Sequence, residues 1–326
     1  MLNFEYLPDE VILQILSYSK TKDLISCGQL SKRVRRISRD DSLWVKANLK
    51  KKIVKTELIE MILSKGCKIL NLHHCTIVGR LSLKIKSQLK FLNFQSSSIW
   101  SCDDEIEERP FLEELLSSCF SLQHLVIGCI SLTPKMAASI CKNGKTLQIL
   151  NLDGMIPPRY VASHRINYFQ EIIRCCQELK EVDLGHEDYE RDFNADFDFL
   201  VRNISPNIEK LRYLSGGEPM DHHLKILLSR CNKIKALSLE ETKISDELLA
   251  NIRKFLNLTL EELSFKLSIN SLSGFLELKS MPRLKTLKLY TYSRKSLSYS
   301  KKIDDEKIQN LKQHLPHLMI KVVQNK

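Results

Sequence analysis

A six-residue pattern, LxxLxL, recurs along most of the sequence. Strong copies are LKFLNF (89–94), LQHLVI (122–127), LQILNL (147–152), LKEVDL (179–184), IKALSL (234–239), LEELSF (260–265) and LKTLKL (284–289). Weaker copies are CKILNL (67–72), IEKLRY (208–213) and a segment at 315–320. Successive copies lie 22 to 33 residues apart. Because one unit of this length cannot bury its apolar side chains alone, the chain is expected to fold as a stack of similar units.

Each copy predicts a short strand, because alternate side chains of an extended segment point to opposite faces. Leu70 and Leu72 should therefore face the core, while Asn71 and His73 face outward. The residues expected in the core share the fourth position of the pattern: Leu70, Leu92, Leu125, Leu150, Val182, Leu211, Leu237, Leu263, Leu287 and Leu318. Stacking these positions would form a continuous apolar spine, in which each buried Leu contributes roughly 1.5 to 3 kcal/mol.

Helices are predicted between the strands. Thr133 before Pro134, and Ser245 before Asp246, have the composition of helix starts, since a hydroxyl can cap the first backbone amides and proline suits the first helical position. Further helical patterns cover 166–176, 197–204, 221–231 and 304–315. Each unit is then a strand followed by a helix.

Residues 1–49 do not follow the repeat and are expected to form three short amphipathic helices. Their apolar positions are Val11, Leu13, Ile15 and Leu16, then Leu24, Ile25 and Leu30, then Val34, Ile37 and Leu43, with Asp23 as the expected cap of the second helix. Lys32, Arg33, Arg35 and Arg36 are expected to form a solvated face of the third helix. So short a segment has little core of its own, which favours an apolar face that meets a partner protein.

The same segment resembles an F-box. Residues 7–44, LPDEVILQILSYSKTKDLISCGQLSKRVRRISRDDSLW, match the family's order of Leu-Pro, Glu-Val, Ile-Leu, Asp-Leu, Ser-Lys-Arg and a closing Leu-Trp, although Val34 stands where an aromatic residue is often found. The resemblance implies docking onto the Skp-type adaptor of a cullin-RING ubiquitin ligase. The residues it implies as adaptor-binding are Leu7, Pro8, Ile15, Leu16, Leu24, Leu30 and Trp44. The alternative is a three-helix cap on a repeat array, since terminal repeats are often atypical.

The repeats resemble leucine-rich repeats over about residues 56–326. An F-box followed by such repeats is similar to the substrate receptors of Skp-cullin-F-box (SCF) ubiquitin ligases, and the link at 50–66 is faintly similar to the S-phase-kinase-associated subtype. The expected fold is α/β: an F-box at 1–49, a basic link with a first helix at 50–66, and a curved solenoid of about ten strand-helix units at 67–326, with a parallel sheet on its concave face. The implied role is selection of proteins for ubiquitination and degradation.

The outward strand positions are the candidate substrate surface. They are Asp153, Asp183, Arg212, Glu240, Lys266, Lys288 and Tyr290, with His73, Asn93 and Gln95 in earlier copies and Arg294 beyond the last full one. Tyr290 and Arg294 are the expected anchors, because Tyr and Arg are enriched in binding hot spots. The alternative for each residue is an ordinary solvated strand face.

Charge is divided unevenly along the chain. The formal net charge of +11 resolves into +6 for residues 1–55, −4 for 56–250 and +9 for 251–326. The last repeats are therefore predicted to bind an acidic or phosphorylated protein segment through Lys266, Arg283, Lys285, Lys288, Arg294 and Lys295. A basic surface that only aids solubility is the alternative. A nucleic-acid partner is less favoured, because the basic residues are not interleaved with aromatic ones.

Other features argue against an enzyme and against secretion. The sequence lacks GxGxxG, GxxxxGK[ST], GxSxG and HExxH, so a non-catalytic subunit without a cofactor is expected. His73, His74 and Cys75 lack a second ligand cluster for zinc.

No leader-like or membrane-spanning apolar stretch occurs, and the ten Cys include no CxxC pair, so reduced thiols and a cytoplasmic or nuclear location without membrane contact are expected. Cys119, Cys176 and Cys231, each three residues before a Leu or Ile of the pattern, are expected to be small buried packing residues. A repeat scaffold that binds without degradation is the remaining alternative.

Overall fold

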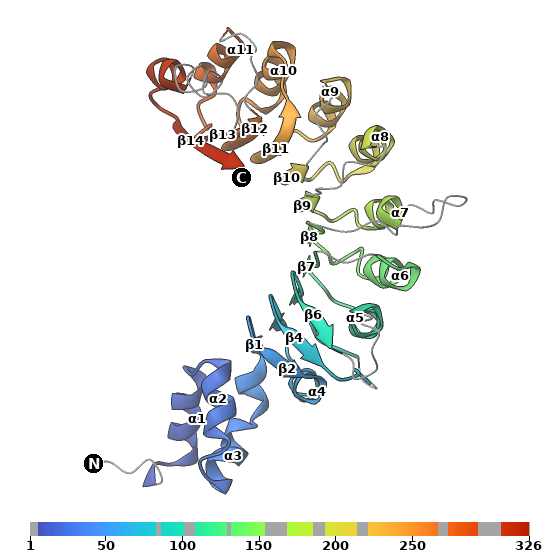
Figure 1. Cartoon of the computed structure of the whole chain (residues 1–326), viewed down its shortest axis with the longest axis vertical. Coiled ribbons are helices and arrows are strands. Elements are labelled where there is room, and N and C mark those ends of the chain that lie inside the picture. Colours follow the sequence, from blue (N-terminus) through green and yellow to red (C-terminus); the bar gives the residue numbers. More distant parts are fainter. Residues whose placement is uncertain are drawn as a thin grey trace. The chain divides into compact units, whose positions relative to one another are not determined.

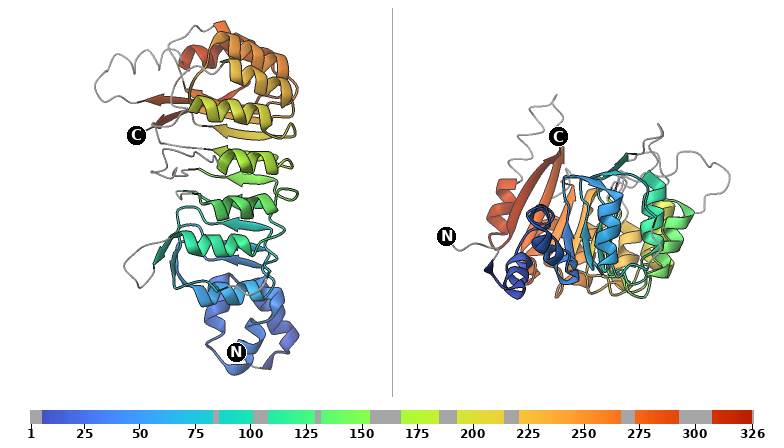
Figure 2. Two further views of the ribbon diagram at one scale, coloured as in Figure 1. Left: turned by 90° about the vertical axis from the view of Figure 1, so that its right-hand side faces the viewer. Right: turned by 90° about the horizontal axis from the view of Figure 1, so that it is seen from below.

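The computed structural model describes residues 6–82, 86–100, 108–128, 132–153, 168–184, 193–213, 221–266, 273–292 and 308–325. The chain divides into two compact units. The first contains Met1–Leu147 and Pro157–Tyr168, and the second contains Gln148–Ile156 and Phe169–Lys326. After the N-terminal helices, short strands alternate with helices along the chain (Figures 1 and 2).

The first unit begins with the three predicted helices. These are α1 (Asp9–Ser17), α2 (Thr21–Cys27) and α3 (Lys32–Ser38), followed by the 3₁₀ turn η2 (Asp41–Trp44). Both α1 and α2 pack on α3. The predicted cap at Asp23 is wrong, because α2 begins two residues earlier, after Lys20, and Asp23 lies in its first turn.

Short parallel strands follow in the first unit. Its elements are β1 (Lys46–Asn48), β2 (Ile53–Lys55), α4 (Thr56–Ser64), β3 (Ile69–Asn71), β4 (Thr76–Val78), β5 (Phe91–Asn93), β6 (Ser98–Trp100), α5 (Glu108–Ser117), β7 (His124–Val126) and α6 (Pro134–Lys142). Strands β1, β3, β5 and β7 pair in that order, all in parallel. A second small sheet, β2-β4-β6, is also parallel and was not predicted. Strand β1 falls inside the segment expected to be F-box, so the sheet starts before residue 50.

The two sheets of the first unit are joined by sharp corners at equivalent positions. Lys51, His74 and Ser96 each have a left-handed backbone, with φ of 59°, 54° and 55°. The corners are linked to one another, since the Lys51 amide donates to the His73 carbonyl at 3.0 Å and the His74 amide donates to the Gln95 carbonyl at 3.1 Å. The repeat therefore includes a turn that its leucine pattern does not reveal.

The second unit contains longer strands towards its C-terminal end. Its elements are β8 (Ile149–Asn151), α7 (Tyr168–Cys175), β9 (Glu181–Leu184), α8 (Phe193–Asn203), β10 (Lys210–Tyr213), α9 (Asp221–Arg230), β11 (Ala236–Lys243), α10 (Asp246–Leu256), β12 (Glu262–Lys266), α11 (Ser273–Leu276), the 3₁₀ turn η3 (Glu277–Ser280), β13 (Thr286–Tyr292), a helical segment at 308–314 and β14 (Met319–Asn325). Strands β8 to β14 pair in chain order, all in parallel. The expected α/β fold, with N-terminal helices followed by parallel strands that alternate with helices, is confirmed.

The predicted apolar spine is buried in both units. Nine of the ten expected core positions, from Leu70 to Leu287, are at most 2% exposed. The register of the final copy is wrong: Leu287 pairs with Ile320 rather than with Leu318, a displacement of two residues. Leu318 is nevertheless buried, just before β14.

The predicted helix starts are confirmed where the cap residues are described. Thr133 Oγ1 accepts a hydrogen bond from the Met136 amide at 3.2 Å, and Ser245 Oγ accepts one from the Leu248 amide at 3.0 Å. The helix predicted at 197–204 begins earlier, at Phe193. Residues 166–167 and 304–307 of two other predicted helices lie outside the described residues. In the described part of the chain, no helix is long and apolar enough to cross a membrane.

Candidate functional site

Helix α1 carries apolar residues on two faces, one buried and one exposed. Ile12 and Leu16 are buried against the rest of the three-helix segment. Val11, Ile15 and Tyr18, spaced four and three residues apart, lie on one other face and are exposed, Ile15 by 42% and Tyr18 by 83%. Such spacing on a folded helix leaves an apolar stripe that its own protein does not cover.

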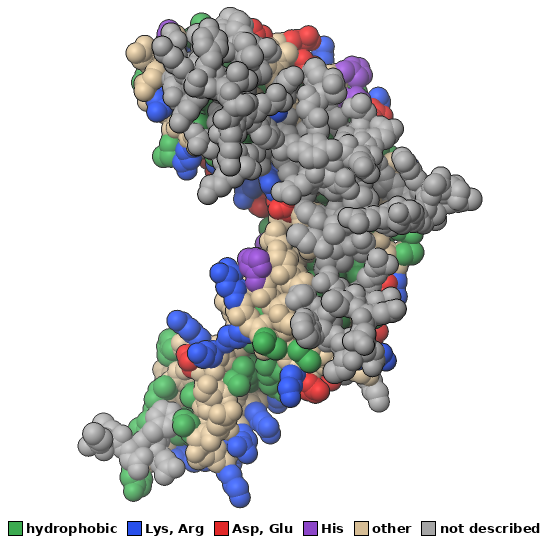
Figure 3. All heavy atoms as spheres, in the orientation of Figure 1, with side chains coloured by type: hydrophobic (Ala, Val, Ile, Leu, Met, Phe, Trp, Pro, Cys, Tyr) green, Lys and Arg blue, Asp and Glu red, His purple; other side chains and the backbone are tan. Residues whose placement is uncertain are grey.

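Further apolar residues of the three-helix segment are also exposed. Tyr6 and Pro8 precede α1, and Leu30, which follows α2, is 71% exposed. We call Tyr6, Pro8, Val11, Ile15 and Tyr18 the α1 face. Green, apolar side chains are visible along the edge of this part of the molecule in Figure 3. Apolar surface gathered on so small a segment indicates a protein-binding site.

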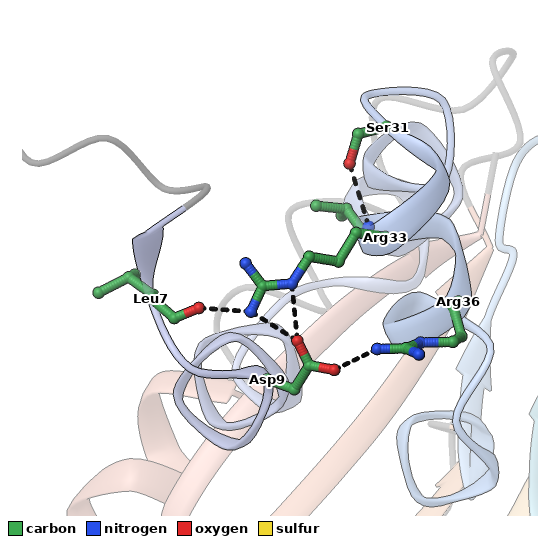
Figure 4. A network of polar contacts seen from close by, with 6 residues as sticks. Leu7, Asp9, Ser31, Arg33 and Arg36 are labelled. Atoms are coloured by element: carbon green, nitrogen blue, oxygen red, sulfur yellow. Dashed lines mark hydrogen bonds and ion pairs between the residues drawn. The ribbon is translucent and has the colours of Figure 1, made fainter.

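A polar network fixes the start of α1 on α3 (Figure 4). Arg33 Nε donates to Asp9 Oδ1 at 2.7 Å, and Arg33 Nη2 donates to the Leu7 carbonyl at 2.6 Å. Arg36 pairs with the other oxygen of Asp9. The hydrogen bond from Arg33 lowers the pKa of Asp9. One guanidinium thus holds both the backbone at Leu7 and the first turn of α1.

The structure separates the expected adaptor-binding residues into two groups. Pro8, Ile15 and Leu30 are exposed and Leu7 is half-buried. The other three expected residues, Leu16, Leu24 and Trp44, are at most 3% exposed. Trp44 Nε1 donates to the Ser38 carbonyl at 2.8 Å inside the segment. These three residues form the core of the three-helix segment. Because they are buried, they are not available for direct contact with a partner.

The basic residues of α3 are solvated as expected, since Lys32, Arg35 and Arg36 are exposed and Arg33 is half-buried, but three of them also have partners. Arg33 and Arg36 pair with Asp9, and Arg35 Nε donates to the Gly28 carbonyl at 2.7 Å. Sequence reasoning also missed Val11 as a surface residue and Tyr18 altogether. The spacing of Val11, Ile15 and Tyr18 was the available signal, and of these three residues only Ile15 is among the expected adaptor-binding residues.

The strand face of the second unit brings three expected substrate-binding residues together. Arg212 Nη1 on β10 lies 3.0 Å from Asp183 Oδ1 on β9 and 3.2 Å from Asp153 Oδ1 after β8. Asn151 Nδ2 donates to the other oxygen of Asp183 at 3.0 Å. About a third or less of each of the three charged side chains is exposed. Arg212 is therefore paired with two carboxylates inside the cluster.

The later strands show the same internal pairing. Lys288 lies 3.3 Å from Glu262, and further pairs of this kind join Lys210 to Glu181, Lys235 to Glu209, and Lys285 to Glu261. Lys266 and Tyr290 lie opposite each other in register on β12 and β13 and are half-buried. The side chain of Glu240 and the whole of Arg294 lie outside the described residues. The predicted basic cluster of the last repeats is thus partly neutralised by glutamates of the preceding strands.

Several cysteines of the repeats are packing residues, whereas the described histidines are exposed or half-buried. Cys119, Cys176 and Cys231 are fully buried, as predicted, and burial raises their pKa values to about 11, 12 and 11. The His73 and His74 rings lie 4.1 Å apart, and Cys75 Sγ donates to the Leu49 carbonyl at 2.9 Å. Within the described ranges, no group of three or more His, Cys, Asp or Glu side chains is arranged to hold a metal ion.

Residues 4–50 match the family model described as F-box-like. The match spans α1, α2, α3, η2 and β1, and it includes every residue of the α1 face and of the Asp9-Arg33-Arg36 network. The chain therefore carries an F-box-like domain, followed by the strand-helix units.

Proposed function

We propose that this chain is the substrate-recognition subunit of an SCF-type cullin-RING ubiquitin ligase. F-box domains generally bind a Skp-type adaptor. The observation that carries the proposal is the exposed α1 face within the F-box-like segment, because it leaves uncovered the kind of apolar surface that such an adaptor would bury.

The strand-helix units are proposed to be leucine-rich repeats that hold the protein substrate. Their support is the LxxLxL spacing, the buried spine and the parallel strands, each followed by a helix in most units. The narrower similarity to the S-phase-kinase-associated subtype has no support from these features.

The proposed role is non-catalytic. The chain would hold a substrate while the adaptor connects it, through cullin and a RING subunit, to an enzyme that carries ubiquitin. The rate of transfer would rise because tethering replaces a bimolecular encounter with a local one at high effective concentration. No residue of this chain needs to act on the reacting atoms.

Co-purification with and without an intact F-box tests the proposal. The wild-type chain and Leu7→Ala/Pro8→Ala would be isolated from cells in which cullin activity is blocked, and bound proteins would be compared. We expect the adaptor, cullin and RING subunit to be lost from the variant while substrates remain with both chains. Those substrates should also persist longer in cells that carry only the variant.

Two outcomes would overturn the proposal. If the adaptor stays with the variant at wild-type levels, then the segment does not dock in the manner of an F-box. If the adaptor is lost but no co-purified protein changes its lifetime, the chain is a binding scaffold rather than a degradation receptor.

A further inference from the structure

The strand face of the first unit carries a row of three asparagines. Asn48, Asn71 and Asn93 lie directly beside one another, because β1, β3 and β5 pair in register at these positions. Each side chain is exposed or half-buried and projects from the face opposite the buried Ala47, Leu70 and Leu92.

The orientation of each carboxamide in the row is fixed by a local hydrogen bond. The Oδ1 atoms of Asn48, Asn71 and Asn93 accept the backbone amide two residues further on, at 3.3, 3.0 and 3.0 Å. Because a backbone amide can only donate, the atom facing it must be the oxygen. The Nδ2 groups therefore point away from these backbone amides. Among the described residues, none of the three Nδ2 groups has a hydrogen-bond acceptor.

Asn151 shows what such a carboxamide binds when an acceptor is present. It occupies the same place on β8, and its Oδ1 accepts the Asp153 amide at 2.9 Å. Its Nδ2 donates to the Asp183 carboxylate at 3.0 Å, on the neighbouring strand. The equivalent groups on β1, β3 and β5 have the same geometry but no carboxylate beside them.

Basic residues without an acidic partner border the asparagine row on both sides. Lys46, Lys68 and Lys90 lie at the entry to β1, β3 and β5, and all three are exposed. Lys50, Lys51, His73 and His74 lie at the exits of β1 and β3. None of these seven side chains has an acidic partner in the described ranges, whereas the lysines of β10 and β13 are paired with glutamates. Blue and purple side chains are visible over this part of the first unit in Figure 3.

The row also has an apolar edge. Ile69 and Phe91, half-buried, occupy neighbouring register positions next to the lysines, and the Phe91 ring meets the His124 ring edge-on at 4.5 Å between centroids. The proximity of the basic groups is reflected in the lowered pKa of His73, caused first by burial and then by His74, Lys50 and Lys51. A partner would thus meet amide donors, cations and a small apolar strip.

We propose that this face, defined by Asn48, Asn71 and Asn93 with their flanking Lys and His residues, binds an extended protein segment rich in Asp and Glu. The proposal rests on the proposed function, since it names the chemistry of the protein that the repeats would hold. Adjacent strands lie about 4.8 Å apart, so the three amides fall within roughly 10 Å, which about three residues of an extended chain can span. It also moves the expected acidic-segment site from the last repeats, where lysines are paired, to the first ones.

Fluorescence anisotropy on the full chain tests the proposal. The probe is a short labelled peptide of alternating Asp and Glu with a central Leu, compared with the same peptide carrying Asn and Gln in place of the acids. The test variant is Asn71→Asp/Asn93→Asp, which keeps the oxygen that accepts the backbone amide but replaces both donors with carboxylate oxygens. The matched control is Asn207→Asp/Asn232→Asp, which makes the same change of charge in the second unit.

We expect the acidic peptide to bind wild type and control equally, and the test variant at least about tenfold more weakly, since each charge-assisted hydrogen bond contributes about as much as a tenfold change in affinity. Equal binding of both peptides by wild type, or equal affinity of test variant and control, would overturn the proposal. Tighter binding of a single-stranded oligonucleotide than of the acidic peptide would also overturn it, in favour of nucleic acid.

Two further measurements keep the outcome interpretable. If Asn71→Asp/Asn93→Asp proves unfolded, Lys68→Gln/Lys90→Gln decides instead, because both lysines are exposed and removing their charge should weaken peptide binding in the same direction. Adaptor binding is measured on every variant. Retained adaptor binding together with absent peptide binding rejects this proposal alone, whereas absent adaptor binding by wild type rejects the ligase role.

Discussion

Cys175 and Cys176 are neighbours in the chain with opposite surroundings. Cys175 is exposed at the end of α7, whereas Cys176 is fully buried and its pKa is raised to about 12. Cys67, Cys119 and Cys231 are buried in a similar way, each with a pKa raised to about 11. Because the thiolate is the nucleophile, both burial and the raised pKa should suppress reaction.

We therefore predict selective alkylation of the native protein. With iodoacetamide near pH 8, Cys175 should be modified well before Cys176, and Cys67, Cys119 and Cys231 should react only after unfolding. Timed labelling followed by peptide mass spectrometry measures the order, and labelling in denaturant is the control. Modification of Cys176 as fast as Cys175 would contradict the burial of Cys176.

Arg33 shows how a charged residue can position an apolar surface. Its guanidinium contacts Asp9 and the Leu7 carbonyl at once, which a lysine cannot do with a single ammonium group. Arg33→Lys should therefore weaken adaptor binding by about three- to tenfold. Arg39→Lys, at the other end of α3, should have no effect, because no side-chain partner of Arg39 is found in the described residues. Equal binding by all three chains in a titration with purified adaptor would contradict the positioning role of Arg33.

At the scale of elements, the left-handed corners explain why the first units can turn from one sheet to the other. A left-handed backbone costs a non-glycine residue roughly 1 to 2 kcal/mol, a cost that glycine does not bear. The corner at Ser96 is exposed, so its side chain contributes little packing.

We predict that glycine is accepted at this corner and not beside it. Ser96→Gly should be more stable than Gln95→Gly by about 1 kcal/mol, since Gln95 has no left-handed backbone to relieve. The midpoints of urea unfolding, followed by circular dichroism, give the difference. Should the two variants unfold at the same midpoint, the corner would not be left-handed in solution.

The elements also show where sequence reasoning succeeds and where it stops. The main strands were predictable because Leu237, Leu239 and their equivalents must be buried together, and α10 because Ser245 caps a clear helical pattern. The sheet β2-β4-β6 was not, because its strands, such as Thr76–Val78, contain no copy of the LxxLxL pattern. The two-residue displacement of β14 could not be predicted from the sequence. Leu318 is buried although it precedes the strand, so the leucine pattern fits either register.

At the scale of the whole molecule, the distribution of paired charge is the feature that sequence could not supply. The sequence shows +9 for residues 251–326, but only the structure shows that Lys285 and Lys288 are paired with Glu261 and Glu262. The F-box was recognisable from Leu7, Pro8 and Trp44, yet which of its residues are exposed depends on how α1 packs. Spacing along a helix identifies faces, and packing decides which face remains open.

The most direct test of the account is a calorimetric titration of the purified chain with a Skp-type adaptor. Wild type should bind it stoichiometrically. Ile15→Asp, which places a charge on the exposed α1 face without disturbing the core, should bind at least about tenfold more weakly, because a desolvated charge at an apolar interface has no partner there. Leu258→Asp, at an exposed apolar site in the second unit, should bind as wild type does. Undiminished binding by Ile15→Asp, or no binding by the wild-type chain, would contradict the assignment of the α1 face as the adaptor-binding surface.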